Sequence, residues 1–169
     1  MKISNYKNLF FDRDGVINEV IMRGSLVSSP RNINEFHIKE DFINFKKRIN
    51  DSIKCFVVTN QPDIARELLT ADELSLMHQK LNNLFNFLEI KYCPHDDSHE
   101  CRCRKPKPGM INSIIKKYNL RKSESLMIGD SLKDVTAAKR SNIDCVYLKT
   151  NYNKKIDDVF NFHSLLDLL

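Results

Sequence analysis

The sequence contains no tryptophan, only four glycines and no long uninterrupted run of apolar residues. A helix that crosses a membrane needs roughly 20 consecutive apolar residues, and no segment approaches this length. The first nine residues carry two lysines and lack the apolar stretch of a signal peptide. We therefore expect a cytoplasmic protein that has no membrane partner.

The sequence also lacks low-complexity tracts and internal repeats, and its length suits one compact domain. It has 169 residues, of which 41% are hydrophobic and 29% are charged. This length leaves little room for a second large domain. The formal charge of +5 is spread along the chain, so a nucleic-acid partner is not required to explain it. We expect a single domain over residues 1–169, and its oligomeric state stays open.

Four short apolar runs have the character of buried strands, and polar residues follow each of them. They cover residues 9–11, 53–59, 125–128 and 145–148. Helix-like stretches occupy residues 40–50, 72–88, 110–118 and 132–141. This alternation predicts an α/β fold, a three-layer, doubly wound, Rossmann-like parallel sheet with helices on both faces. Such sheets bind their ligands at the carboxyl ends of the strands.

The second helix-like stretch has a clear start signal and an apolar stripe. Thr70 and Glu73 form the pattern of a capping box, in which each side chain bonds the backbone amide of the other residue. The apolar positions at helical spacing, which we expect to be core, are Leu74, Met77, Leu81, Leu84, Phe85 and Leu88.

Acidic and phosphate-binding residue types stand at the ends of the predicted strands or close behind them. In chain order they are Asp12 with Asp14, Thr59, Lys105, and Asp130 with Asp134. With this order and strand context, the chain resembles the haloacid dehalogenase (HAD) phosphohydrolases, and the match spans almost the whole chain. The resemblance implies a HAD-like fold without a large cap domain, and Mg²⁺-dependent phosphatase activity.

The resemblance also implies a role for each of the acidic residues. Asp12 would be the nucleophile, because a carboxylate can split the difficult displacement at phosphorus into two easier steps. Asp14 would protonate the leaving oxygen and then accept a proton from the attacking water. Asp12, the main-chain carbonyl of Asp14, and Asp130 would hold Mg²⁺, which relieves the repulsion between carboxylates and phosphate. Asp134 would have a supporting role.

Three further residues would hold the transferring phosphoryl oxygens in the same scheme. They are Thr59, the amide of Asn60, and Lys105, whose charge offsets the charge that accumulates on those oxygens. Ser131 stands where many members of the family place a lysine, and Lys133 could substitute for it.

A second metal site is predicted from cysteine and histidine spacing. Three thiols and one imidazole gather within eleven residues, at Cys93, His95, Cys101 and Cys103. This set suits tetrahedral zinc and leaves no position for water, so we expect a structural Zn²⁺ that stiffens the following loop. Three other cysteine and histidine residues are not predicted to bind zinc. We expect His99 to be an exposed loop residue, and Cys55 and Cys145 to be core residues.

The segment after the cysteines narrows the resemblance further. Residues 104–110 read Arg-Lys-Pro-Lys-Pro-Gly-Met, which is similar to the D-glycero-D-manno-heptose 1,7-bisphosphate 7-phosphatases and the related histidinol phosphatases. In that case Arg104, Asn60 and Gln61 would bind a small phosphorylated sugar, and residues 19–36 would form the specificity loop. Histidinol phosphate is the alternative substrate, a non-catalytic zinc-stabilised binding module is the alternative class, and the sequence leaves the sugar anomer open.

Overall fold

A six-stranded parallel sheet forms the centre of the computed structural model, which describes residues 2–157 and 159–169. The strand order is β5-β4-β1-β6-β7-β8. Their bounds are β1 (Asn8–Phe11), β4 (Lys54–Asn60), β5 (Glu89–Cys93), β6 (Ser125–Gly129), β7 (Asp144–Leu148) and β8 (Phe160–Phe162). The predicted parallel sheet is confirmed. The edge strands β5 and β8 were not predicted, because they are only partly buried and lack a continuous apolar run.

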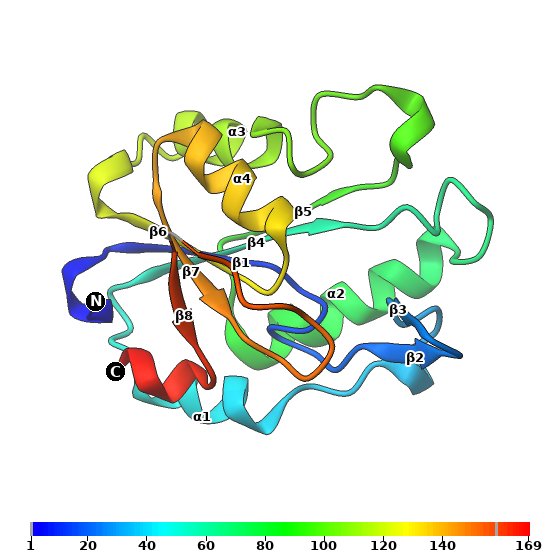
Figure 1. Cartoon of the computed structure of the whole chain (residues 1–169), viewed down its shortest axis with the longest axis horizontal. Helices are drawn as coiled ribbons and strands as arrows, with labels where there is room; N and C mark the ends of the chain where they lie inside the picture. Colours follow the sequence, from blue (N-terminus) through cyan, green and yellow to red (C-terminus); the bar gives the residue numbers. More distant parts are fainter. Residues whose placement is uncertain (1, 158) are drawn as a thin grey trace.

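Four helices cover the two faces of this sheet. Their bounds are α1 (Glu40–Arg48), α2 (Ala71–Phe85), α3 (Gly109–Lys117) and α4 (Leu132–Ser141). Helices α1 and α2 lie on one face, and α3 and α4 lie on the other (Figure 1). Successive strand residues point to opposite faces, so Leu9 and Phe11 join the core beneath α1 and α2, whereas Phe10 joins the core beneath α3 and α4. The expected three-layer α/β architecture is therefore present.

The connections contain short elements only. An antiparallel hairpin of β2 (Ile21–Arg23) and β3 (Leu26–Ser28) lies within the expected specificity loop. The 3₁₀ helices are η1 (Ile3–Asn5), η2 (Ile33–Glu35), η3 (Asp97–His99), η4 (Lys122–Glu124) and η5 (Leu165–Leu168). In the described part of the chain, the segment between β1 and α1 holds only this hairpin and η2, so no large cap covers the sheet edge. Among all the residues that the structure describes, no helix is long and apolar enough to span a bilayer.

Helix α2 differs from its prediction at both ends. The Glu73 amide donates to Thr70 Oγ1 at 3.2 Å, as expected. The Glu73 carboxylate, however, accepts from the Ile33 amide at 2.7 Å. The predicted return bond from Glu73 to the Thr70 amide is therefore wrong. The helix ends at Phe85 because Asn86 adopts a left-handed φ of 51°. Leu84 and Leu88 are 57% and 49% exposed. Their predicted core positions are wrong, because the buried stripe ends with the packed ring of Phe85.

Candidate active site

The predicted acidic residues and lysine meet at the carboxyl ends of three adjacent strands. Asp12 follows β1, Thr59 and Asn60 end β4, and Asp130 follows β6. Lys105 enters from the loop between β5 and α3, and its Nζ lies 2.9 Å from Asp12 Oδ1. These residues, Asp130 excepted, line a cavity of about 260 Å³. The topology thus joins residues that are far apart in the sequence.

Lys105 is held at both its charged group and its backbone. Its side chain is 2% exposed and pairs with Asp12 and with Asp134, at 2.9 and 2.6 Å. Burial alone would lower the pKa of the ammonium, but the two carboxylates outweigh burial and raise it, so Lys105 stays charged. The Asn60 side chain accepts from the Lys105 amide at 2.9 Å and donates to the Lys105 carbonyl at 3.0 Å. The side chain of Asn60 therefore positions the lysine.

Three carboxylates surround that single ammonium. Oxygen atoms of Asp12, Asp130 and Asp134 lie within 4.8 Å of one another. Burial, and then the charge of Asp134, raise the pKa of Asp12 to about 8 and that of Asp130 to about 7. Crowded, buried carboxylate oxygens are the donor set that suits a hard divalent cation such as Mg²⁺. The residues therefore fit the predicted metal.

Asp134 differs from the other two carboxylates because protein groups already engage both of its oxygens. Oδ1 pairs with Lys105, and Oδ2 accepts from the Ser131 amide at 3.1 Å and from the Ser131 hydroxyl at 2.5 Å. These bonds cap the amino end of α4. This arrangement suits the predicted supporting role of Asp134 and leaves Asp12 and Asp130 to bind a cation.

The acidic cluster should make the metal-free protein less stable as the pH rises from about 4 to about 8. In this range the folded carboxyls of Asp12 and Asp130 hold protons that an unfolded chain, with pKa values near 3.8, has already released. A rising pH therefore favours unfolding. We expect Tm without added Mg²⁺ to be lower near pH 8 than near pH 5, and Mg²⁺ to restore much of the difference. An equal or higher Tm near pH 8 without Mg²⁺ would contradict this expectation.

Asp14 lies beside the cluster in a very different environment. Its oxygens accept from the Arg13 guanidinium, from Asn18 Nδ2 at 2.9 Å, from Gln61 Nε2 at 2.8 Å and from the Ser29 hydroxyl at 2.8 Å. Burial alone would raise the pKa of Asp14, but the Arg13 charge and these donors together lower it. The free protein therefore holds Asp14 as a carboxylate.

The predicted zinc ligands also come together. The ligand atoms of Cys93, His95, Cys101 and Cys103 lie within 4.8 Å of one another. This group offers sulfur and nitrogen ligands and no carboxylate. The sulfur–sulfur distances are 3.0 to 3.5 Å, too long for disulfides. Burial would raise the pKa of Cys101, but the backbone amides of Arg104 and Cys103 help to lower it to about 6. Three sulfurs and one imidazole around one point are compatible with a zinc site.

Comparison with known proteins shows to which family the chain belongs. A family profile described as haloacid dehalogenase-like hydrolase matches residues 37–148. The chain belongs to this family.

Relatives and a solved structure agree with this assignment. A D-glycero-beta-D-manno-heptose-1,7-bisphosphate 7-phosphatase from Neisseria meningitidis serogroup A is 38% identical over 136 residues, which cover 78% of this chain and 71% of the relative. A D-glycero-alpha-D-manno-heptose-1,7-bisphosphate 7-phosphatase from Photorhabdus laumondii is 32% identical over 166 residues, which cover 90% of this chain and 87% of the relative.

One solved structure with a similar fold is D,D-heptose 1,7-bisphosphate phosphatase from B. bronchiseptica, complexed with magnesium and phosphate. Its superposition on this chain has a TM-score of 0.81 and covers 94% of this chain and 93% of that chain, with 24% sequence identity. At this identity the likeness shows a shared fold. The family and the two sequence relatives identify the chain as a phosphatase. The predicted family and enzyme class are confirmed, and a non-catalytic binding module is no longer a competing interpretation.

Two of the predicted substrate-binding residues of this haloacid dehalogenase family member have other contacts in the structure. Gln61 is fully buried, and its amide engages Asp14 together with Thr59 Oγ1, at 2.9 Å, and Arg13, at 3.0 Å. Its side chain holds Asp14 and is not exposed, which does not agree with a direct contact between Gln61 and the substrate. Arg104 lines the cavity, and its Nε donates to Asp97 Oδ1 at 2.7 Å.

Arg13 is a site residue that was not predicted from the sequence. Its side chain is fully buried, and its guanidinium lies 5.4 Å from the ring centroid of Phe36. Nη1 faces His78 Nε2 at 3.3 Å. Burial, and then the Arg13 charge, lower the pKa of His78 to about 3, so this imidazole is neutral and accepts the bond. The only available signal was a cation between the two aspartates.

Gly15 explains the sharp turn after Asp14. Its φ is 85°, and a Cβ at this position would collide with the Asp130 carboxylate and with the Tyr152 hydroxyl. Glycine is thus required here both for its backbone conformation and for the close approach of β6 and the loop after β7.

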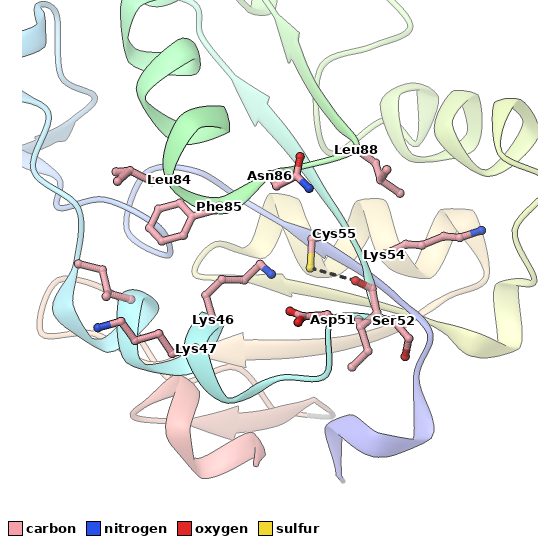
Figure 2. Close-up of a pocket in the computed structure, with 12 residues that line it drawn as sticks. Lys46, Lys47, Asp51, Ser52, Lys54, Cys55, Leu84, Phe85, Asn86 and Leu88 are labelled. Carbon is pink, nitrogen blue, oxygen red and sulfur yellow. Dashed lines mark hydrogen bonds between the residues drawn. The ribbon is translucent and has the colours of Figure 1, made fainter.

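One cavity of the structure is remote from this site. It measures about 790 Å³ and lies where β4 begins, between α1 and the end of α2 (Figure 2). Lys46, Lys54 and Leu88 are among its lining residues. Because the acidic cluster lies at the other end of the strands, this cavity has no part in the chemistry described above.

Proposed function

We propose that the chain hydrolyses a phosphate monoester through a phospho-aspartate at Asp12, and that its substrate is D-glycero-D-manno-heptose 1,7-bisphosphate, which loses the 7-phosphate. The observation that carries this proposal is the gathering of Asp12, Asp14, Lys105 and Asp130 at one sheet edge. The names of the two sequence relatives support the choice of substrate. We also infer a cytoplasmic location, where the three zinc-site cysteines would not form disulfides.

In the first step, an oxygen of Asp12 attacks phosphorus and the bond from phosphorus to the sugar oxygen breaks. Asp14 gives a proton to that oxygen, so the sugar leaves with a hydroxyl group. Asp14 is ionised in the free protein. A phosphate dianion beside it would raise its pKa, because like charges disfavour the ionised form. Lys105, held by Asn60, stabilises the charge on the transferring oxygens.

In the second step, water attacks the phosphorus of the phospho-aspartate and gives a proton to Asp14. The bond between Asp12 and phosphorus breaks, the carboxylate is restored and inorganic phosphate leaves. The donors around Asp14 favour its carboxylate form, which is the form that accepts this proton.

Two metals complete the proposal. Mg²⁺ would be held by Asp12, Asp130 and the main-chain carbonyl of Asp14, where it would neutralise charge between the carboxylates and the phosphate. Zn²⁺ would be held by the three cysteines and His95 and would have a structural role, with no open position for water.

Cations at the cavity suit a substrate that carries a second phosphate. Arg104 and Lys133 line the same cavity as Asp12 and Lys105. A guanidinium and an ammonium group are the side chains that commonly bind phosphate. Ser131 also lines this cavity. A monophosphate such as histidinol phosphate would bring no second phosphate to these two cations.

We expect phosphate release from heptose 1,7-bisphosphate to exceed release from histidinol phosphate by about tenfold or more in kcat/KM, a free-energy difference of about 1.4 kcal/mol. Both heptose anomers should be tested, because relatives of each specificity are known. Equal or exclusive turnover of histidinol phosphate would contradict the substrate assignment.

A further inference from the structure

Tyr152 approaches the acidic cluster from the loop between β7 and β8. Its hydroxyl donates to Asp130 Oδ2 at 2.6 Å. We infer that Tyr152 is a positioning residue that orients the Asp130 carboxylate for cation binding. This inference rests on the proposed Mg²⁺ site, and it adds a residue to which neither the motifs nor the comparisons assign a role.

The loop holds Asp130 at two points. Besides the hydroxyl of Tyr152, the Asn153 side chain donates to the Asp130 carbonyl at 2.9 Å and to the Leu148 carbonyl at 3.0 Å. The Thr150 amide donates to Asn153 Oδ1 at 2.9 Å, which fixes the turn. Both the backbone and the side chain of Asp130 are thus tied to one short segment.

The catalytic turn leaves space for this contact. A Cβ on Gly15 would meet both the Asp130 carboxylate and the Tyr152 hydroxyl, so these two groups lie directly against the turn that carries Asp14. With Oδ2 engaged by the phenol, the carboxylate of Asp130 has a fixed orientation beside Asp12 and Asp134. Hydrogen bonds to metal-binding carboxylates pre-set their orientation, and their loss commonly weakens metal binding.

The test compares two tyrosines that contact the same loop. Tyr152→Phe removes the hydroxyl on Asp130. Tyr147→Phe removes a hydroxyl that donates to the Lys154 carbonyl at 3.0 Å, and it leaves Asp130 untouched. Mg²⁺ binding to the full-length chain is measured by calorimetry. The apparent Mg²⁺ activation constant and kcat at saturating Mg²⁺ are measured in parallel, and Tm without added Mg²⁺ reports folding.

We expect Tyr152→Phe to weaken Mg²⁺ binding by about tenfold, with kcat at saturating Mg²⁺ much less affected, and Tyr147→Phe to bind like the parent. Parental Mg²⁺ affinity in Tyr152→Phe would overturn the inference. Equal weakening in both variants would also overturn it, since loop order rather than the hydroxyl would then be responsible. Failure of the parent chain to bind Mg²⁺ would instead contradict the proposed metal site itself.

Discussion

We expect Asp12→Asn to lower kcat by roughly 10⁴-fold or more, because an amide cannot form the covalent intermediate. The substitution keeps the size of the side chain and one oxygen. Asn at this position should still accept from the Arg13 amide, which donates to Asp12 Oδ1 at 2.7 Å. Initial rates of phosphate release at saturating substrate and Mg²⁺ measure the effect.

The control for this variant is Asp157→Asn, which removes one carboxylate from a side chain that is 89% exposed. We expect parental activity from it. Thermal unfolding of Asp12→Asn shows whether the loss arises from misfolding. A folded Asp12→Asn protein that keeps more than about a hundredth of the parental kcat would contradict the covalent mechanism.

Cys101→Ala should lose bound zinc and most of the activity. Removing one of four ligands opens a structural site whose apparent binding free energy is about 10 to 16 kcal/mol in small zinc domains. A bound Zn²⁺ would stiffen the loop that leads directly into Arg104 and Lys105, and a displacement of about 1 Å in an active site can cost about 100-fold in rate. Elemental analysis should therefore report one zinc per parental chain and little in the variant.

Cys55→Ala is the matched control because Cys55 lies in the core beneath α1 and α2, whereas the three zinc-site cysteines lie in or against the core beneath α3 and α4. It should keep both zinc and activity. Unchanged zinc content in Cys101→Ala would remove the assignment of this ligand. Loss of zinc with full activity would show that the loop does not depend on the metal to position Lys105, whose backbone is also held by Asn60.

The central strands could be predicted because they are buried on both faces. Every residue of β1 and β6 is buried, and each strand holds a run of three large apolar residues, 9–11 and 126–128. This pattern is visible in one sequence. Strand β5 alternates charged and apolar residues at an edge, and β8 has only three residues. Their pairing with β4 and β7 is what defines them, and pairing is a tertiary property.

The same distinction applies to the site. The motif order located Asp12, Lys105 and Asp130, because the ends of parallel strands must meet at one edge. It could not show which way the neighbouring side chains point. Gln61 faces Asp14, and Arg13 is buried by groups from several distant segments. Tyr152 lies in a loop that has no periodic pattern.

The central claim is that the phosphoryl group passes through Asp12, and rapid acid quench during turnover of the parent enzyme tests it most directly. We expect one phosphoryl group on the peptide that contains Asp12, bound in the alkali-labile manner of an acyl phosphate, and none in the Asp12→Asn protein. Steady phosphate release with no phosphorylated peptide at any quench time, or a phosphoryl group on a different residue, would contradict this account.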